Sequence, residues 1–505
     1  GADIAELSAN AADPDWLLAN QKSINRAQHD LTRAAKPTIA LIDGDCIGGG
    51  CGLALACDFR VVSPRSRFGI TPAKLGLVYP LHDTKLLVDL VGPAQAKRIL
   101  FTGTLIDAAT AHRMGLIDEI AENADPLIGM LIALNFTSGE KDVSHEIPRL
   151  YSTQDPQFRR AIGSLLGPPL VGGNRAQELL NGDQIFPAML TSIKGAQKTI
   201  TFETYIYWSR DIGNEFALAL SERAKAGVKV HVLLDWLGSA KIDESILEEM
   251  RTAGVQIRKF HKPHWYNWGR MNNRTHRKLL VVDGKTGFTG GVGIAPQWTG
   301  AGQDADHWRD SHFKLEGPAV SQMQAVFMDN WLKVTGHVMH GEPYFPALQP
   351  VGNSLAQVFS SSPAGGSESM QLMYQLSITA ADKSIDLSSA YFVPDELTTK
   401  ILVDALRRGV KIRIITPGEI IDTDTVRAAS RGTWGQLLKA GAEIFEYQPS
   451  MYHCKVMIVD KLLVSVGSTN FDNRSFRLND EANLNVFDAG FAERQTGIFE
   501  TDLRH

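Results

Sequence analysis

The chain has 505 residues, of which 44% are hydrophobic and 21% charged, and 51 basic side chains nearly balance 56 acidic ones for a net charge of −5. This composition is typical of a globular protein with about three domains. It disfavours a dedicated nucleic-acid binder, which carries a basic excess. The sequence contains no run of about 18 apolar residues, so we predict no transmembrane helix. The first residues show no signal-peptide pattern. The 4 cysteines have neither disulfide nor zinc spacing, so we expect free thiols in a reducing cytoplasm.

Residues 1–137 alternate short β-branched runs with alanine-rich stretches. A strand is predicted at Thr38–Ile42, and a helix is predicted around Leu53–Cys57 after a glycine-rich turn. Residues 138–171 are polar and then rich in glycine and proline, which predicts a linker.

From residue 172 on, the chain repeats itself. One copy predicts a strand from Lys198, a helix that ends near Arg223 and another strand, and the second copy predicts the same order from Lys383. Such β–α–β units suit a parallel, helix-covered sheet. A second helix follows in each copy, at 244–253 and 433–440, before a glycine that fits a left-handed turn. We therefore predict two similar α/β domains, 172–350 and 351–505, that face each other.

The same short motif ends both copies. It reads His-x-Lys-x4-Asp-x6-Gly, with identical spacing each time. The candidate catalytic residues in the two copies are His276, Lys278, Asp283, His453, Lys455 and Asp460. Histidine and lysine two positions apart on a strand share one face of the sheet. Because the spacing recurs inside a long repeat, we set aside the simpler interpretation of two unrelated strand histidines.

This pattern favours phosphate chemistry. If the copies pack about a pseudo-twofold axis, two imidazoles and two ammonium groups converge on one point. One histidine can attack phosphorus and the other can protonate the leaving alkoxide, while the lysines neutralise the phosphoryl oxygens. Lysine is not a usual metal ligand and the ligand spacings of metal sites are missing. We therefore expect neither a metal nor another cofactor.

Residues from about 172 to 505 resemble the phospholipase D superfamily, and within it the bacterial cardiolipin synthases. The segments after the two motifs, 308–320 and 470–483, extend this resemblance. It implies two α/β/α sandwich domains related by a pseudo-twofold axis, with His276 as nucleophile of a phosphohistidine intermediate and His453 as general acid. The residues that it implies for orienting the histidines and binding phosphate are Gly290, Gly291, Asp310, Ser468, Asn470 and Glu481. One departure is Gly293, which stands where the family has asparagine.

Residues 1 to about 130 resemble part of a crotonase (enoyl-CoA hydratase) domain, in an incomplete ββα form. The Gly1-Ala2-Asp3 and Gly48-Gly49-Gly50 segments carry the likeness, which implies thioester-polarising N–H groups at Ala2 and Gly49. The two positions that match the glutamates of the active hydratase hold Gly52 and Ala73. We therefore expect no activity towards coenzyme A thioesters from this segment.

A run of aromatic and basic side chains precedes the first motif, at 261–270, and suits a membrane interface as well as a packed loop. Together these features predict a phosphatidyltransferase that converts two phosphatidylglycerol molecules to cardiolipin and glycerol. The alternatives are a hydrolase of phospholipids or nucleic acids and a crotonase-like acyl-CoA-binding protein. We expect a phospholipid substrate, no nucleic-acid partner, and a cytoplasmic location with peripheral contact to the cytoplasmic membrane.

Overall fold

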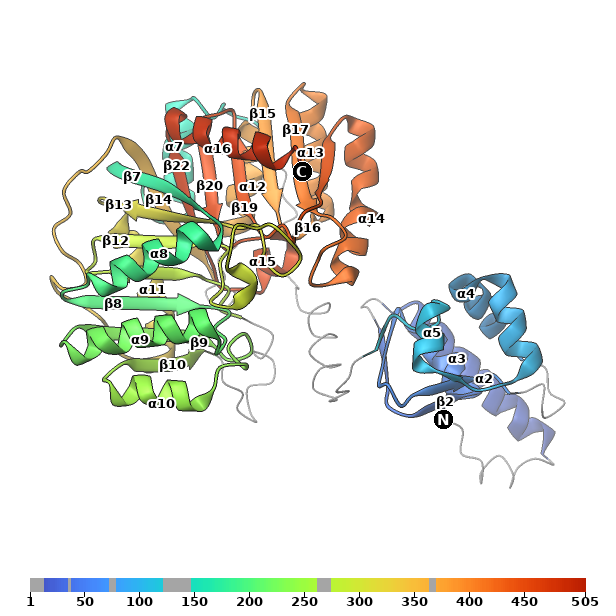
Figure 1. The fold of residues 1–505 in the computed structure, drawn as a ribbon. Helices are drawn as coiled ribbons and strands as arrows, with labels where there is room; N and C mark the ends of the chain where they lie inside the picture. Colours follow the sequence, from blue (N-terminus) through green and yellow to red (C-terminus); the bar gives the residue numbers. More distant parts are fainter. Residues whose placement is uncertain (1–12, 35–37, 72–78, 121–146, 261–273, 363–368) are drawn as a thin grey trace. The chain divides into compact units, whose positions relative to one another are not determined.

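The computed structural model describes residues 13–34, 38–71, 79–120, 147–260, 274–362 and 369–505 (Figure 1). The chain divides into two compact units, Gly1–Glu140 and Lys141–His505, which are described separately. None of the helices in the described ranges combines the length and apolar character needed to cross a bilayer.

The first unit contains two small sheets, of order β1-β3-β6 and β2-β4-β5, and four described helices. The predicted strand is β1 and the predicted helix is α3, which begins at Gly49. The elements are α2 Pro14–Thr32, β1 Ile39–Ile42, β2 Asp45–Ile47, α3 Gly49–Ala56, β3 Phe59–Val62, β4 Arg67–Gly69, α4 Leu81–Thr102, β5 Ile106–Asp107, α5 Ala108–Arg113 and β6 Glu119–Ile120.

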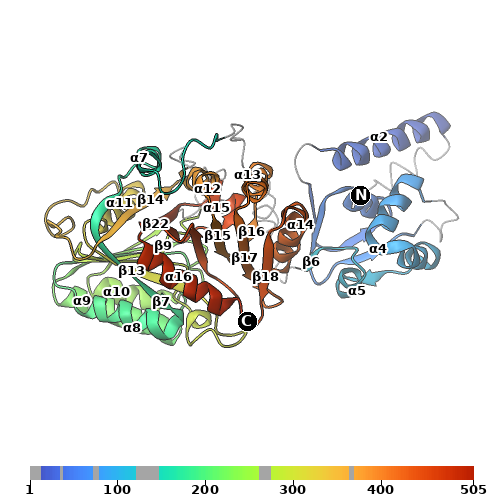
Figure 2. The ribbon, with the colours of Figure 1, turned by 90° about the horizontal axis from the view of Figure 1, so that it is seen from above.

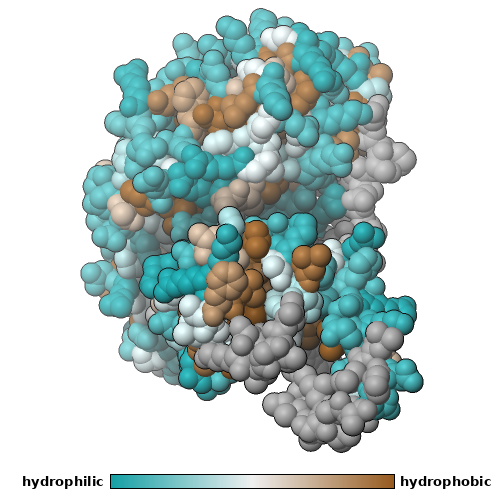
Figure 3. Space-filling model, turned by 90° about the vertical axis from the view of Figure 1, so that its right-hand side faces the viewer, coloured by the Kyte–Doolittle hydropathy of each residue, from teal (hydrophilic) through white to brown (hydrophobic). Residues whose placement is uncertain are grey.

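Local side chains fix the helix starts in this unit. The Asp13 carboxylate accepts the N–H groups of Asp15 and Trp16 at the start of α2, and Asp107 caps α5 in the same way. Exposed large hydrophobic side chains accompany this small core, and hydrophobic residues interrupt the hydrophilic surface of the face shown in Figure 3. In the described part of the unit the exposed ones are Leu41, Phe59, Leu81, Phe101 and Leu105.

The second unit is built on one 14-stranded sheet of order β10-β9-β8-β11-β12-β13-β7-β14-β22-β20-β19-β15-β17-β18. In its first half the elements are α7 Pro156–Leu165, β7 Val171–Leu180, α8 Asn181–Lys194, β8 Thr199–Thr204, α9 Asp211–Lys225, β9 Lys229–Asp235, α10 Glu244–Thr252, β10 Gln256–Phe260, β11 Leu279–Val282, β12 Thr286–Gly290, β13 Ser311–Glu316 and α11 Val320–Thr335, with a 3-10 turn at Pro296–Trp298. In its second half they are β14 Ser354–Ser361, α12 Ser369–Ala380, β15 Ser384–Ser389, β16 Phe392–Val393, α13 Glu396–Arg407, β17 Lys411–Pro417, α14 Asp424–Ala440, β18 Glu443–Tyr447, β19 Lys455–Val459, β20 Leu463–Gly467, β21 Phe471–Asp472, α15 Asn473–Arg477, β22 Glu481–Phe487 and α16 Ala489–Asp502.

The sheet shows the sequence repeat directly. Read inward from each edge, β10-β9-β8-β11-β12-β13-β7 corresponds to β18-β17-β15-β19-β20-β22-β14, and the two halves join where β7 pairs antiparallel with β14. Figure 2 shows α8 and α16 along one face of this sheet and α11 and α12 along the other. Both halves are therefore α/β/α layers of the predicted kind, and the motif strands β11 and β19 lie near the middle of each half.

Part of the segment expected as a linker is folded into this unit. The helix α7 buries Phe158, Ile162 and Leu166 in the core of the second half. The Thr153 hydroxyl also donates a 2.6 Å hydrogen bond to Asp460. The polar stretch before this amphipathic helix and the glycine- and proline-rich segment after it concealed it from the sequence, since only one of its faces is apolar.

Candidate active site

The two motif histidines lie at the contact between the two halves of the second unit. Lys278 comes directly before β11 and Lys455 is the first residue of β19, and each motif histidine, His276 or His453, lies two residues before its lysine. The His276 N–H donates to the carbonyl oxygen of Asp480 at 2.9 Å, and the His453 N–H donates to the carbonyl oxygen of Arg309 at 2.8 Å. Each histidine is thus anchored by backbone to the opposite half of the unit.

The side chains cross in the same way. The His276 Nδ1 lies 3.0 Å from both carboxylate oxygens of Glu481, and the His453 Nδ1 lies 2.7 Å from Asp310 Oδ2. A carboxylate accepts hydrogen bonds, so each Nδ1 carries the proton and each Nε2 is left for chemistry. Each half therefore supplies the carboxylate that orients the other half's histidine.

Different donors hold the two carboxylates. Glu481 accepts the Ser468 hydroxyl at 2.5 Å and the Asn479 side-chain amide at 3.2 Å. Asp310 accepts the Trp298 indole N–H at 2.9 Å and the Ser311 backbone N–H at 2.8 Å.

The charge state of the carboxylates follows from their partners. Burial raises the pKa of Asp310 and of Glu481, but the facing histidine and the neighbouring lysine outweigh burial and leave each pKa below its ordinary value. Both carboxylates are therefore ionised.

The histidines and lysines are buried bases. Burial lowers the pKa of His276 to about 4 and that of His453 to about 3. It also lowers the pKa of Lys278 to about 7 and lowers the pKa of Lys455. Both imidazoles are therefore neutral near pH 7 before an anion enters, with a lone pair available on Nε2.

Each lysine folds back on its own motif. The Lys278 ammonium donates to the carbonyl oxygen of His276 at 2.7 Å, and the Lys455 ammonium donates to that of His453 at 2.6 Å. The ammonium of Lys278 also lies 5.4 Å from the centre of the Tyr205 ring, and this ring meets the His276 imidazole edge-on at 5.3 Å.

A cavity of about 460 Å³ opens onto both histidines. Such a volume fits a small head group rather than water alone. The side chains that line it are Tyr205, Ile206, Trp208, Arg274, His276, Lys278, Gln297, Trp298, Trp308, Tyr391, Asp422, Thr423, His453, Asn470, Asp472, Arg474, Ser475 and Asn479. Of the predicted residues, His276, Lys278, His453 and Asn470 are in this lining, while Lys455, Asp310, Glu481 and Ser468 are buried behind it.

The predicted glycines allow close approach. A Cβ atom at Gly290 would lie 2.5 Å from His312 Nδ1, and one at Gly291 would lie 2.3 Å from Asp310 Oδ1. The absence of side chains there lets β13 carry Asp310 against the site. At Gly293 a Cβ atom would lie 3.0 Å from the Trp298 ring, so this tryptophan occupies the space of the expected asparagine.

Asp283 and Asp460 do not reach the histidines. The Asp283 carboxylate accepts the backbone N–H groups of residues 197–199, and Asp460 accepts those of residues 382–384. Both take a left-handed φ of +52°, which aspartate tolerates. We therefore propose that they order the starts of β8 and β15 and take no part in the chemistry for which the motif spacing had suggested them.

A further carboxyl group lies behind His276. Glu203 on β8 accepts the side-chain amide of Asn330 at 2.8 Å and the hydroxyl of Thr275, the residue before the histidine. Burial raises the pKa of this carboxyl to about 7. Sequence patterns gave no sign of Glu203, Trp298, Gln297 or Tyr205, because they come from outside the motifs.

Three expectations concern residues outside the described ranges: the aromatic run at 261–270, Ala2 and Ala73. Gly52 is described, and a Cβ atom there would lie 2.6 Å from Gln28 Nε2 and 2.7 Å from Asp83 Oδ2. This buried pair fills the space into which a glutamate side chain would project.

The fold and the candidate active site together define an enzyme of the phospholipase D superfamily. Residues 189–331 and 375–503 match the family described as cardiolipin synthase, PLD-like domain. The chain is 36% identical to cardiolipin synthase A of Pseudomonas aeruginosa over 347 residues, which cover 68% of this chain and 70% of the relative. It is 34% identical to cardiolipin synthase 2 of Bacillus cereus over 370 residues, covering 72% and 71%. The chain therefore belongs to the family of PLD-like cardiolipin synthases.

The fold has a solved counterpart. Phosphatidylserine synthase of Haemophilus influenzae is similar with a TM-score of 0.51 at 13% identity, over 69% of this chain and 91% of that one. Residues 1–133 match the enoyl-CoA hydratase/isomerase family, which agrees with the crotonase-like segment expected from the sequence.

Proposed function

We propose that the second unit transfers a phosphatidyl group from one phosphatidylglycerol molecule to another, giving cardiolipin and glycerol. The observation that carries the proposal is the crossed pair of histidines, each neutral and each held at Nδ1 by a carboxylate of the other half. The cardiolipin synthases among its relatives support the choice of lipid.

In the first step, His276 Nε2 attacks phosphorus and the bond from phosphorus to the glycerol oxygen breaks. His453 protonates that oxygen, in the charged form that an anionic phosphodiester beside it stabilises. In the second step, His453 takes the proton from the primary hydroxyl of the second phosphatidylglycerol, whose oxygen attacks phosphorus and releases His276. Lys278 and Lys455 balance the negative charge of the phosphoryl oxygens.

The test follows labelled phosphatidylglycerol in vesicles and identifies the lipid products. We expect cardiolipin and free glycerol, and no turnover in His276→Ala or His453→Ala. Wild-type protein denatured at alkaline pH, where the phosphorus–nitrogen bond of a phosphohistidine is stable, should carry label from a phosphate-labelled donor, and the His276→Ala protein should carry none. Phosphatidate as the sole product would show a hydrolase instead, and near-normal turnover of His276→Ala would refute the two-histidine mechanism.

We also propose that the activity needs no metal, because lysines supply the positive charge. Turnover should survive EDTA, whereas complete loss that zinc restores would contradict the proposal. The substrate lipid resides in a bilayer, so we infer that the protein works in peripheral contact with the cytoplasmic membrane face, without nucleic acid. For the first unit we propose no hydration of crotonyl-CoA, since Gly52 has no side chain to move a proton.

A further inference from the structure

The proposed transfer requires one place to serve two alcohols in turn. In an in-line displacement at His276, the leaving oxygen departs on the far side of phosphorus, beside His453. The incoming hydroxyl must then approach from that same side and give its proton to His453. Whatever lies next to His453 therefore determines which alcohol is accepted, and whether water is accepted.

Two tryptophans lie next to His453. The rings of Trp298 and Trp308 are centred 5.3 Å and 5.5 Å from the imidazole and 4.6 Å from each other. The Trp298 indole N–H is already bonded to Asp310, so this residue offers the cavity only ring surface. Trp208 adds a third ring to the lining, and its N–H is bonded to the carbonyl oxygen of Gly238 at 3.1 Å.

A polar side chain accompanies these rings. Gln297 lines the cavity beside Trp298, and its side-chain oxygen is buried without a hydrogen-bond partner in the described part of the chain. The backbone carbonyl oxygen of Gln297 accepts the backbone N–H of Trp308 at 2.6 Å, which links the glutamine to the second tryptophan. A buried amide oxygen without a partner is unfavourable, and a ligand hydroxyl that reached it would donate the missing hydrogen bond.

The wall beside His276 is different in character. It contains Tyr205 and two cationic side chains, Arg274 and Arg474, which the two halves contribute separately. Charged side chains thus accompany the nucleophile, and aromatic rings with a glutamine beside them accompany the acid.

We infer that Gln297, Trp298 and Trp308 form the subsite for the alcohol, the leaving glycerol in the first step and the glycerol head group of the acceptor in the second. The inference rests on the proposed function, because it assumes that His276 is the nucleophile. The Gln297 oxygen accepts one hydroxyl of the glycerol, and the rings cover its carbon chain. A lone water molecule cannot contact the rings and the glutamine at the same time, so the subsite favours transfer over hydrolysis.

The experiment measures how the labelled phosphatidyl group divides between cardiolipin and phosphatidate. The full-length protein acts on phosphatidylglycerol vesicles, and wild type is compared with Gln297→Leu and Trp308→Ala. Each variant should lower the ratio of cardiolipin to phosphatidate at least tenfold, because water then competes for an alcohol site that has lost a contact. Added glycerol, which returns the phosphatidyl group to phosphatidylglycerol in competition with water, should suppress phosphatidate formation less in the variants than in wild type.

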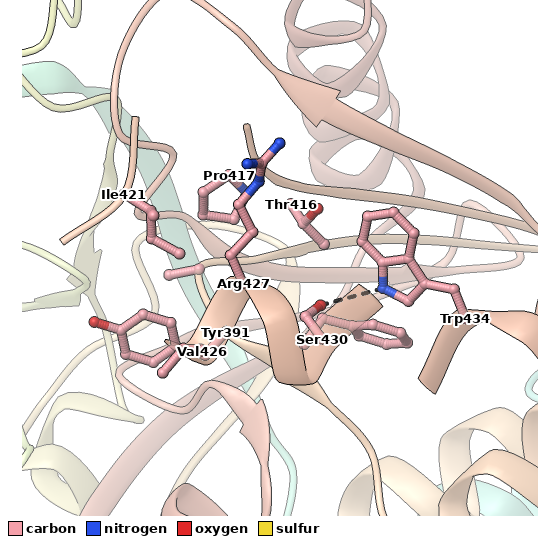
Figure 4. Close-up of a pocket in the computed structure, with 10 residues that line it drawn as sticks. Tyr391, Thr416, Pro417, Ile421, Val426, Arg427, Ser430 and Trp434 are labelled. Atoms are coloured by element: carbon pink, nitrogen blue, oxygen red, sulfur yellow. Dashed lines mark hydrogen bonds between the residues drawn. The ribbon is translucent and has the colours of Figure 1, made fainter. Parts of the chain in front are cut away.

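Trp434→Ala is the matched control. Figure 4 shows Trp434 on α14 of the second half, with its indole N–H bonded to Ser430 Oγ at 3.1 Å. It borders a separate hollow of only about 10 Å³, with room for a single water at most. The product ratio of this variant should equal that of wild type.

An unchanged ratio in Gln297→Leu would overturn the inference, and so would an equal loss of both products. Should Trp308→Ala fail to melt cooperatively, Gln297→Leu alone decides. If Arg274→Gln changes the ratio and Gln297→Leu does not, the alcohol lies beside His276 and the inference is wrong. Wild type that forms phosphatidate but no cardiolipin would instead refute the proposed function.

Discussion

Asp310→Asn should damage the enzyme far more than Glu481→Gln, although the two carboxylates have equivalent places in the repeat. The described donors to Asp310 are all N–H groups: the Trp298 indole and the Ser311 backbone cannot act as acceptors, and the His453 ring can do so only in its other tautomer. An asparagine in either orientation therefore turns its NH₂ group towards an N–H group. One orientation forces His453 into the wrong tautomer, and the other leaves the Ser311 N–H unsatisfied.

Glu481→Gln meets a milder conflict, because His276 Nδ1 lies 3.0 Å from both carboxylate oxygens and one oxygen remains to accept its proton. The Ser468 hydroxyl, which now donates to Glu481 at 2.5 Å, can rotate to donate fully to the carbonyl oxygen of Ala482, which lies 3.3 Å away. The glutamine NH₂ then donates to Ser468, while its oxygen keeps the hydrogen bonds from His276 and Asn479. The charge is lost, and the NH₂ group takes the place of one of the two oxygens that face His276 Nδ1.

The magnitudes follow from these contacts. Replacing a charge-assisted hydrogen bond by a neutral one costs about 1–1.5 kcal/mol, so Glu481→Gln should lower kcat about tenfold. A wrong histidine tautomer costs about 10⁴-fold in the serine proteases, and Asp310→Asn should approach that loss. In the other orientation His453 keeps its tautomer, and the orphaned Ser311 N–H instead costs about 1–3 kcal/mol of stability.

The assay is the initial rate of glycerol release from phosphatidylglycerol vesicles, with thermal melting of each variant as a check on folding. Glu481→Ala, which removes the hydrogen bond as well as the charge, is the control for the charge effect. The argument from donor direction is refuted if Glu481→Gln is as impaired as Asp310→Asn, or if Asp310→Asn retains a tenth of wild-type activity.

The remaining predictions concern pH and the division of the chain. Because burial lowers the pKa of Lys278 to about 7, its ammonium charge is lost as pH rises through 7; kcat/KM should fall there, and Lys278→Arg should abolish that limb of the pH profile. Burial raises the pKa of Glu203 to about 7, above its unfolded value, so wild type loses stability as pH rises from about 4.5 through 7. Glu203→Gln should escape this loss, and its unfolding free energy should gain up to about 3 kcal/mol on wild type between pH 5 and 8; parallel denaturation curves at both pH values would contradict this. A chain shortened to start near residue 144 should keep its phosphatidyl transfer, since every site residue lies in the second unit; a folded but inactive product would place the first unit in the working site.

The repeat could be predicted from the sequence because its cause is local. A strand, a helix and a strand each leave a pattern in consecutive residues, and the spacing from His276 to Gly290 recurs between His453 and Gly467. The convergence of the two motifs then follows from symmetry alone.

The rest depends on docking, which leaves no local pattern. The resemblance supplied Asp310 and Glu481 as orienting residues, but only the packed halves show that each one serves the histidine of the other half. Trp298 reaches the site through a turn, and no spacing rule connects it to His453. Asp283 shows the opposite case, in which the motif spacing suggested a catalytic role. A fixed position in a motif can instead reflect the backbone N–H groups that the side chain accepts.

Because of the crossed carboxylates, neither half can evolve independently of the other. A half made alone would contain a histidine without its carboxylate and a carboxylate without its histidine, so neither copy of the duplicated gene could be discarded once the exchange was in place. An ancestor with a single copy could have worked only as a symmetric dimer. Fusion into one chain removed the need for identical halves, and Trp298 opposite Asn470 records how far they have since diverged.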